Sequence, residues 1–378
     1  ADMLIEAAGV PFDSIYLAEA RKNNIPIEMD ASLFTKFTKA KIIGITGTRG
    51  KSTVTKMIYH GLKKYYKKGN VFLGGNIRGL ATLPLLEKLP HSAKATRGQD
   101  NNIIVLELDS WQLQGFGESK ISPHIAVFTT FMNDHMNYYK NDMQRYFDDK
   151  AEIFKYQTEN DFLIISEQAM VQIKKKTQYG KIKSKITVVN EDAIRNFKTK
   201  LIGEHNKTNI ALAVEVLKLI KLNQKQIKQA IATYPGEPGR LQMISKKSGI
   251  TYYNDSNATT PDACIAALNS LNENKKNIIL ICGGANKELN FNDMLEVIVN
   301  TTKNVVFIKG TATDKILSIL PKDFPEHIVV DSMQSAVKEA RKFSKKGDII
   351  LLSPGAASFG VFKNEYDRSD QFLKYVKK

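Results

Sequence analysis

Cysteine is nearly absent from this chain, which contains two in 378 residues, Cys264 and Cys282. Neither lies in a Cys-x-x-Cys pattern, so the sequence offers no disulfide framework and no cysteine zinc site, which fits a reducing compartment. Long apolar runs are also missing, since no stretch approaches the roughly 20 apolar residues that a membrane span needs. The first residues lack the basic segment and apolar run of a secretory signal. We therefore expect a cytoplasmic protein without a membrane span.

Acidic residues are scarce relative to basic ones, because 39 Asp and Glu against 55 Lys and Arg give a net charge of +16. One interpretation is nucleic-acid binding, since phosphate backbones attract clusters of Lys and Arg. The other is a lysine-rich, solvated surface together with a site for anionic substrates. The densest basic run, residues 173–185, contains one aromatic residue and no recognition-helix pattern. We therefore expect small anionic substrates and no nucleic acid as partner.

Short runs of β-branched and aliphatic residues alternate with helix-length amphipathic segments, which is typical of parallel α/β sheets. Pro and Gly concentrate at residues 234–239, where we place a domain boundary. Strands are predicted at 41–46, 71–73, 103–108, 125–128 and 162–165, then in a hairpin at 241–244 and 250–254, then at 278–282, 305–308, 327–330 and 349–352. Helices are predicted at 51–65, 142–155 and 206–220, and a polar surface loop at 87–102. The predicted fold class is α/β, with a central phosphate-loop-type parallel-sheet domain (41–238) followed by a Rossmann-like C-terminal domain (239–378).

The most specific local pattern leads from a strand into a helix and comprises Gly47, Thr48, Arg49, Gly50, Lys51, Ser52 and Thr53. The two glycines allow the backbone to turn its N–H groups toward phosphate oxygens, and the helix N-terminus adds partial positive charge. Lys51 can bridge the outer phosphates, and Ser52 can place its hydroxyl on Mg²⁺. Ile45 replaces the first glycine of the strict Gly-x₄-Gly-Lys-Ser/Thr pattern, so a plain glycine-rich turn is the alternative.

Two further groups of polar residues follow predicted strands. Glu107 and Asp109 end the apolar strand 103–108, where a carboxylate can reach Mg²⁺ held by a neighbouring phosphate loop. Because side chains alternate between the two faces of a strand, both carboxylates point to the same side, and one can face the site while the other caps the strand end. The alternative is that both simply lie at a surface-exposed strand end. His135 follows the strand at 125–128, at the edge where open α/β sheets bind ligands, although a lone histidine is often structural.

Taken together, these segments resemble the Mur ligase family, ATP-dependent amide-forming enzymes of peptidoglycan and cell-wall synthesis. The shortened loop Gly-Thr-x-Gly-Lys-Ser/Thr of that family accounts for Ile45. The likeness runs in order from about residue 9 to the C-terminus. Its other segments are Gly74-Gly75-Asn76-Ile77, Leu106-Glu107-Leu108-Asp109-Ser110-Trp111-Gln112-Leu113, Asn133-Asp134-His135, Gly203-Glu204-His205-Asn206-Lys207-Thr208-Asn209, Asn254-Asp255-Ser256-Asn257-Ala258-Thr259, Gly283-Gly284 and Leu352-Ser353-Pro354-Gly355-Ala356-Ala357-Ser358-Phe359.

The resemblance implies an activity and a set of residue roles. The chain would add D-glutamate to a UDP-linked muramoyl-alanine through an acyl phosphate, as a monomer, with ATP and two Mg²⁺ ions. Lys51, His135 and Lys150 would be catalytic, and Ser52, Glu107, His135 and a carbamylated Lys150 would hold the metal. Beyond the phosphate loop, the residues implied for ATP are Asn206, Asn209, Arg240 and Asp255. Those implied for the two substrates are Asn76, Thr259, Lys287, Ser358 and Phe359.

Several departures from the family pattern concern the substrates. Residues 9–40 resemble only the last segment of the family's N-terminal uridine-binding domain and its linker, so residues 1–40 are expected to be a remnant of that domain and the linker. Asn257 stands where the pattern usually has Lys, Pro238-Gly239-Arg240 replaces a His-Arg pair, and Glu365-Tyr366 alters an aromatic position. The alternatives are therefore a related ligase using another amino acid or a polyglutamate, a nucleic-acid-dependent ATPase, and a non-catalytic nucleotide-binding relative. An exposed, unmodified helical lysine is the alternative interpretation of Lys150.

Overall fold

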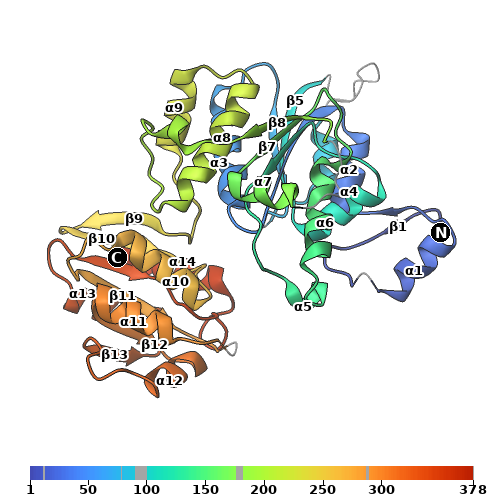
Figure 1. The fold of residues 1–378 in the computed structure, drawn as a ribbon. Coiled ribbons are helices and arrows are strands. Elements are labelled where there is room, and N and C mark those ends of the chain that lie inside the picture. The colour runs from blue at the N-terminus through green and yellow to red at the C-terminus, as the bar shows by residue number, and fades with distance from the viewer. Residues whose placement is uncertain (12, 78, 90–99, 176–181, 287–288, 378) are drawn as a thin grey trace. The chain divides into compact units, whose positions relative to one another are not determined.

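The computed structural model describes residues 1–377 except 12, 78, 90–99, 176–181 and 287–288. The chain divides into two compact units. Unit 1 comprises Ala1–Thr199 with His205–Tyr234, and unit 2 comprises Lys200–Glu204 with Pro235–Lys378. Figure 1 labels the elements of each unit, which are described separately below.

Unit 1 is built on a six-stranded, entirely parallel sheet in the order β4-β5-β3-β6-β7-β8. In chain order the strands are β3 (Ala40–Thr46), β4 (Val71–Gly75), β5 (Asp100–Glu107), β6 (Ile125–Phe128), β7 (Phe162–Ile165) and β8 (Lys185–Val188). The strands at the centre are apolar on both faces, as expected of a parallel sheet covered by helices on both sides. The C-terminal ends of β3, β5 and β6 therefore share one edge, from which the candidate site is built.

Helices cover both faces of this sheet (Figure 1). On one face, a core that includes Ile104, Phe128 and Phe147 packs α2 (Asp30–Phe37), α4 (Ser110–Glu118) and α6 (Met143–Lys155) against the strands. On the other, α3 (Lys51–Tyr65) contacts β3, β4 and β5 and packs against α8 (His205–Leu219) and α9 (Gln224–Thr233). Other described helical segments of unit 1 are α5 (Met136–Tyr139), α7 (Glu167–Lys174), η1 (Leu83–Lys88) and η3 (Glu191–Ile194).

The first residues form a small substructure of their own. The parallel pair β1 (Leu4–Ile5) and β2 (Ile27–Glu28) is joined by α1 (Ile15–Lys22). Its small core is formed by Leu17, Ala20 and Ile27.

Unit 2 contains a second six-stranded sheet, in the order β13-β12-β11-β14-β10-β9, of which only β9 runs antiparallel to its neighbour. Its strands are β9 (Gln242–Lys247), β10 (Ile250–Asn254), β11 (Ile278–Gly283), β12 (Thr302–Ile308), β13 (His327–Val330) and β14 (Ile349–Leu352). One face carries α10 (Pro261–Leu271), α11 (Asn292–Thr301) and α12 (Thr311–Leu317), and the other carries α13 (Met333–Phe343) and α14 (Glu365–Lys377). The turn between β9 and β10 has positive φ at Ser248 and Gly249, the geometry that suits a tight two-residue hairpin.

The α/β fold class is confirmed, with a central parallel sheet followed by a second, Rossmann-like sheet. The predicted loop at 87–102 is wrong in part: residues 90–99 lie outside the described residues, but Asp100–Glu107 forms a strand. Asp100 pairs with Ala40, and the buried Asn102 accepts a hydrogen bond from the backbone N–H of Asn70 (2.9 Å). Backbone pairing and side-chain hydrogen bonds therefore extend the strand into polar sequence. Among the described residues, no helix is both long and apolar enough to cross a membrane.

Candidate active site

The loop between β3 and α3 has a backbone that only glycine fits at two positions. Gly47 has φ +140°, and a Cβ there would lie 2.0 Å from Thr129 Oγ1 and 2.8 Å from Thr130 N. Gly50 has φ +87°, and its Cβ would lie 2.3 Å from Asn209 Oδ1. The turn is therefore closely packed against β6 and α8, and the α3 N-terminus, whose first turn has no acidic residue, follows directly. This arrangement is suited to a phosphate group.

Lys51 and Lys150 converge on this loop. Lys51 Nζ donates hydrogen bonds to Gly47 O (3.0 Å) and Thr48 O (3.2 Å), and Lys150 Nζ donates to the same Gly47 O (2.9 Å). Lys150 is only 1% exposed, and its ammonium lies 4.9 Å from the centre of the Tyr146 ring. Burial, reinforced by the charge of Lys51, holds the pKa of Lys150 well below its usual value. The interpretation of Lys150 as an exposed helical lysine is therefore wrong.

The end of β5 supplies two carboxylates with different partners. Glu107, 4% exposed, accepts a hydrogen bond from Ser52 Oγ (3.1 Å). Asp109 is instead the N-cap of α4 and accepts from the backbone N–H of Gln112 (2.8 Å). Its second oxygen accepts from Asn76 Nδ2 (3.0 Å), which fixes the Asn76 side chain at the end of β4. Glu107 thus lies beside the phosphate loop, while Asp109 orients Asn76.

His135 lies on an aromatic surface close to the same loop. Its backbone has φ +56°, and its ring lies 4.8 Å from Trp111 and 6.1 Å from Tyr146, measured between ring centres. The Tyr146 hydroxyl in turn lies 3.3 Å from Thr48 Oγ1. Partial burial lowers the pKa of His135, although Asp134 opposes this shift, so the imidazole favours the neutral form that coordinates metals.

The residues of this edge fit Mg²⁺ bound together with phosphates. Among the described residues, no cluster of three or more His, Cys, Asp or Glu could hold a metal alone. Mg²⁺, however, usually takes one or two carboxylates and completes its shell with waters and substrate phosphates. The adjacent Ser52 hydroxyl and Glu107 carboxylate are such a donor set. The residues therefore suit a metal that arrives with a nucleotide.

Asn206 and Asn209 lie on α8 and are both buried. Asn209 Nδ2 donates to Asn206 Oδ1 (3.0 Å), and the Asn209 side chain packs against Gly50. The pair therefore couples α8 to the phosphate loop.

In unit 2, two loops bring several predicted residues together. Asp255, 9% exposed, accepts hydrogen bonds from Ser353 Oγ (2.8 Å) and the Leu241 backbone N–H (2.9 Å). Burial raises the pKa of Asp255 to about 7, against the opposing hydrogen bonds. The Gly355 N–H donates to Ala258 O (2.9 Å), which joins the loop after β10 to the loop after β14.

The other predicted residues of unit 2 differ in exposure. Thr259 is half-buried and Ser358 buried on the two joined loops, whereas Arg240 is exposed and Phe359 is 57% exposed. Lys287 lies outside the described residues.

Arg368 is a residue of this region that sequence reasoning missed. It is completely buried on α14, and its guanidinium donates to Ser256 O (2.8 Å) and Ala356 O (3.1 Å), one carbonyl in each loop. Burial lowers the pKa of Arg368 to about 10. A signal was present, since Arg368 precedes Phe372 and Val376 at four-residue spacing, on the buried face of the helix.

The comparisons with known proteins match both units. Residues 45–188 match the Mur ligase middle domain, and residues 239–355 match the Mur ligase, glutamate ligase domain. The chain belongs to the Mur ligase family, whose members are ATP-dependent, amide-forming enzymes.

Two curated relatives share the name UDP-N-acetylmuramoylalanine–D-glutamate ligase. That of Borreliella afzelii is 33% identical over 398 residues, covering 100% of this chain and 82% of the relative. That of Aquifex aeolicus is 31% identical over 383 residues, covering 99% and 88%. The chain is thus similar to these ligases along its whole length.

Solved structures at lower identity share the fold. The UDP-N-acetylmuramate-alanine ligase of Thermotoga maritima has a TM-score of 0.63 at 20% identity, covering 100% of this chain and 85% of that one. The MurF ligase of the same organism, solved in complex with ADP, has a TM-score of 0.63 at 16% identity, covering 99% and 94%.

Proposed function

We propose that this chain joins D-glutamate to the alanine carboxyl group of UDP-linked muramoyl-alanine, with ATP converted to ADP and phosphate. The proposal rests chiefly on the phosphate loop, whose backbone requires glycine at two positions and to which Lys51 and the buried Lys150 both donate hydrogen bonds. Ser52 and Glu107 lie beside it. The full-length similarity to ligases of that name supports the choice of substrates.

The first step forms an acyl phosphate at the edge of the unit 1 sheet. The alanine carboxylate attacks the γ-phosphorus, the bond to the β-phosphate oxygen breaks, and ADP leaves. Lys51 and the backbone N–H groups of the loop offset the charge on the phosphates as this bond breaks. Asn76, fixed by Asp109, would orient the acceptor carboxylate.

We propose that Ser52, Glu107, His135 and Lys150 hold two Mg²⁺ ions, which would supply further positive charge at the transferred phosphate. The buried Lys150 amine is suited to carbamylation, because a neutral amine adds to carbon dioxide and loses a proton to give a carboxylate. That carboxylate would be attracted to the positive charge of Lys51, which disfavours an ammonium at the same place.

The second step releases phosphate and makes the amide bond. The amine of D-glutamate attacks the acyl carbon, a proton is lost, and phosphate leaves from the tetrahedral intermediate. We assign D-glutamate to Thr259, Lys287, Ser358 and Phe359. For ATP we assign Asn206 and Asn209 to adenine, and Arg240 and Asp255 to ribose and phosphate. Residues 41–238 would thus be the central ATP-binding domain, and residues 239–378 would bind the incoming amino acid and contribute Arg240 and Asp255 to the nucleotide.

Amino-acid-dependent phosphate release tests this proposal. With ATP, Mg²⁺ and UDP-muramoyl-L-alanine present, D-glutamate should stimulate phosphate release, and L-glutamate, of equal charge, should not. If only a different amino acid stimulates phosphate release, the chain has the activity of another ligase of the family. A Lys51→Gln variant should lose the stimulation, because it keeps a long polar side chain but removes the charge.

A further inference from the structure

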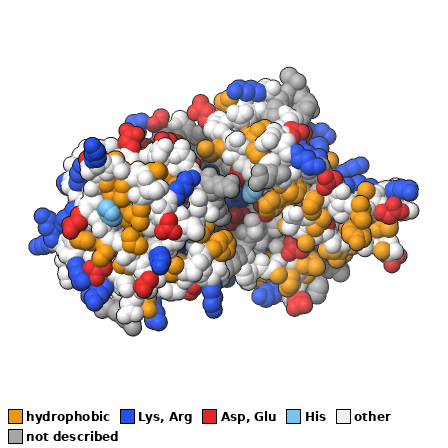
Figure 2. All heavy atoms as spheres, turned by 90° about the horizontal axis from the view of Figure 1, so that it is seen from below, with side chains coloured by type: hydrophobic (Ala, Val, Ile, Leu, Met, Phe, Trp, Pro, Cys, Tyr) orange, Lys and Arg blue, Asp and Glu red, His pale blue; other side chains and the backbone are white. Residues whose placement is uncertain are grey.

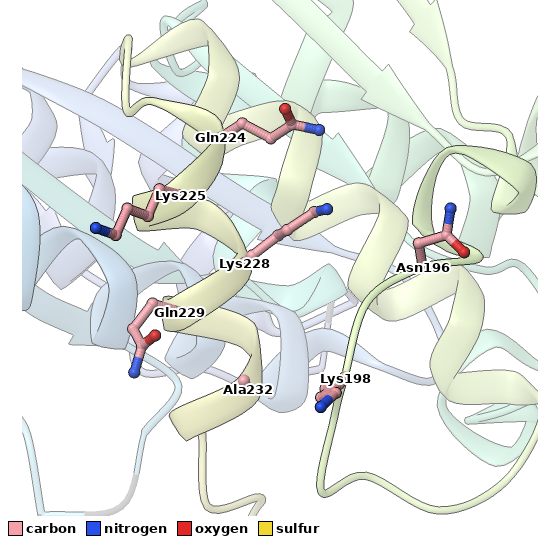
Figure 3. A pocket seen from close by; sticks show the side chains of 7 residues that line it. All are labelled: Asn196, Lys198, Gln224, Lys225, Lys228, Gln229 and Ala232. Carbon is pink, nitrogen blue, oxygen red and sulfur yellow. The ribbon is translucent and has the colours of Figure 1, made fainter.

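A concave site on unit 1 is lined by none of the residues assigned above. Its cavity has a volume of about 490 Å³. Five lining residues belong to α9 and two precede α8: Gln224, Lys225, Lys228, Gln229 and Ala232, with Asn196 and Lys198 (Figure 3). The size falls within the roughly 300–1,000 Å³ typical of small-molecule sites.

The packing of α9 explains why these side chains gather on one side of the helix. Ile227, Ala230 and Ile231 form its buried face, and the helix contacts α3 and α8. Residues 224, 228 and 232, with 225 and 229, recur at four-residue spacing and so share the remaining flank. The segment containing Asn196 and Lys198 closes the other side of the cavity, and Figure 3 shows the Lys228 side chain extending toward Asn196.

The charge of the cavity has one sign. Its lining contains three lysines and no acidic residue. Among the described residues, no carboxylate lies within ion-pair distance of Lys198, Lys225 or Lys228, whereas the nearby Arg195 and Lys218 are paired with Asp192 and Glu215. The Lys228 ammonium lies 5.8 Å from the centre of the Phe197 ring. An anion entering the cavity would therefore meet ammonium groups not already neutralised by a carboxylate.

Exposed lysines on a helix are ordinarily solvated, so charge alone does not define a ligand. Here the lysines share a cavity with three side-chain amides, those of Asn196, Gln224 and Gln229, which both donate and accept hydrogen bonds. Lysine is a point-charge donor suited to phosphate oxygens, and amides suit the rest of a polar molecule. We propose that this cavity binds a small ligand bearing two or more phosphates, of nucleotide size, independently of the phosphate loop.

Titration calorimetry with inorganic tripolyphosphate tests the site, with the Lys51→Gln variant used throughout to weaken binding at the phosphate loop. In that background, tripolyphosphate should still bind. Adding Lys198→Gln, Lys225→Gln and Lys228→Gln should weaken this binding by at least about tenfold, the effect of losing one charge-assisted hydrogen bond. Adding Lys246→Gln, Lys322→Gln and Lys338→Gln instead, three exposed lysines of unit 2 with the same change in charge, should have an effect below about threefold.

Three results would overturn the proposal: no binding in the Lys51→Gln background, equal weakening by the two triple substitutions, or equal affinity for citrate, a polyanion without phosphate. The second would show a general effect of net charge, and the third a site without preference for phosphate. Thermal unfolding of both triple variants would show whether they remain folded. Single Lys228→Gln and Lys338→Gln substitutions repeat the comparison of tripolyphosphate affinity with less perturbation of the fold. ADP, titrated in the same way, should bind and should lose affinity with the same three substitutions; no binding of ADP would overturn the assignment to a ligand of nucleotide size.

Discussion

Gly50→Ala tests whether the phosphate loop depends on its contact with α8. The φ of +87° is strained for alanine and costs about 1–2 kcal/mol. The added Cβ would also lie 2.3 Å from Asn209 Oδ1, so that side chain has to move. Moving it breaks the Asn209–Asn206 hydrogen bond between two buried amides, which costs about 1–3 kcal/mol. We therefore expect a total loss of about 2–5 kcal/mol in the free energy of unfolding.

Gly9→Ala is the matched control, because Gly9 has the same φ of +87° with no described atom within 4 Å of the added Cβ. It should lose only the strain term, about 1–2 kcal/mol. Denaturant unfolding of both variants measures the difference, and the KM for ATP should rise only in Gly50→Ala. In an Asn209→Ala background the steric conflict disappears, so Gly50→Ala should cost no more than Gly9→Ala. Equal costs for the two glycine substitutions, with no coupling to Asn209, would refute the reasoning.

Two further predictions follow from the buried groups Lys150 and Asp255, and a third from Trp111 beside His135. While Lys150 is unmodified, its lowered pKa means that the folded state binds fewer protons than the unfolded state between the folded-state pKa and 10.5. In protein freed of carbon dioxide, Lys150→Met should therefore stabilise the protein at neutral pH. Denaturation at several pH values should show this gain shrinking as pH rises toward 10.5. The pKa of Asp255 is raised from 3.8 to about 7, so this carboxyl makes the folded state less stable as pH rises through that window. Between pH 4 and pH 7, the free energy of unfolding of Asp255→Asn should therefore gain about 3–5 kcal/mol relative to that of the parent. A difference that stays constant with pH would contradict the raised pKa. Trp111 is the only tryptophan of the chain and lies against His135. Its fluorescence should therefore change when Mg²⁺ and a non-hydrolysable ATP analogue are added together. His135→Asn should remove the part of this change that depends on the metal.

The sequence predicted most of the sheet because strand signals and burial coincide there. The runs at 125–128 and 162–165 became β6 and β7 with the predicted bounds, since an apolar run buried on both faces is unambiguous. The edge strand β8 was missed although three of its four residues are β-branched, because Lys185–Val188 is short, mostly exposed and directly follows a basic run. Polar strand residues such as Asn102 were missed because the residues to which they form hydrogen bonds, here Asn70, are distant in sequence.

The candidate site was predictable only where function depends on local geometry. The phosphate loop could be identified because glycines, Lys51 and Ser52 act within a few residues of one another. The burial of Lys150 could not, since it depends on Gly47, which is distant in sequence, and on the Tyr146 ring. Arg368 likewise gains its role from two carbonyls on separate loops, and one-dimensional spacing reports only that it lies on a buried helix face.

Figure 2 shows Lys and Arg side chains scattered among Asp and Glu on the face drawn, rather than gathered into one stripe. On the face drawn, the Lys and Arg side chains therefore form no continuous basic track.

Oxygen transfer from the acceptor tests the ligase account most directly. UDP-muramoyl-L-alanine labelled with ¹⁸O in the alanine carboxylate is incubated with ATP, Mg²⁺ and D-glutamate, and the released phosphate is analysed by mass spectrometry. An acyl phosphate requires that one carboxylate oxygen leave with the phosphate, so each phosphate should carry one ¹⁸O, matched by one molecule of glutamyl product. Phosphate without label, released at the same rate, would mean that water attacks ATP and would contradict the account.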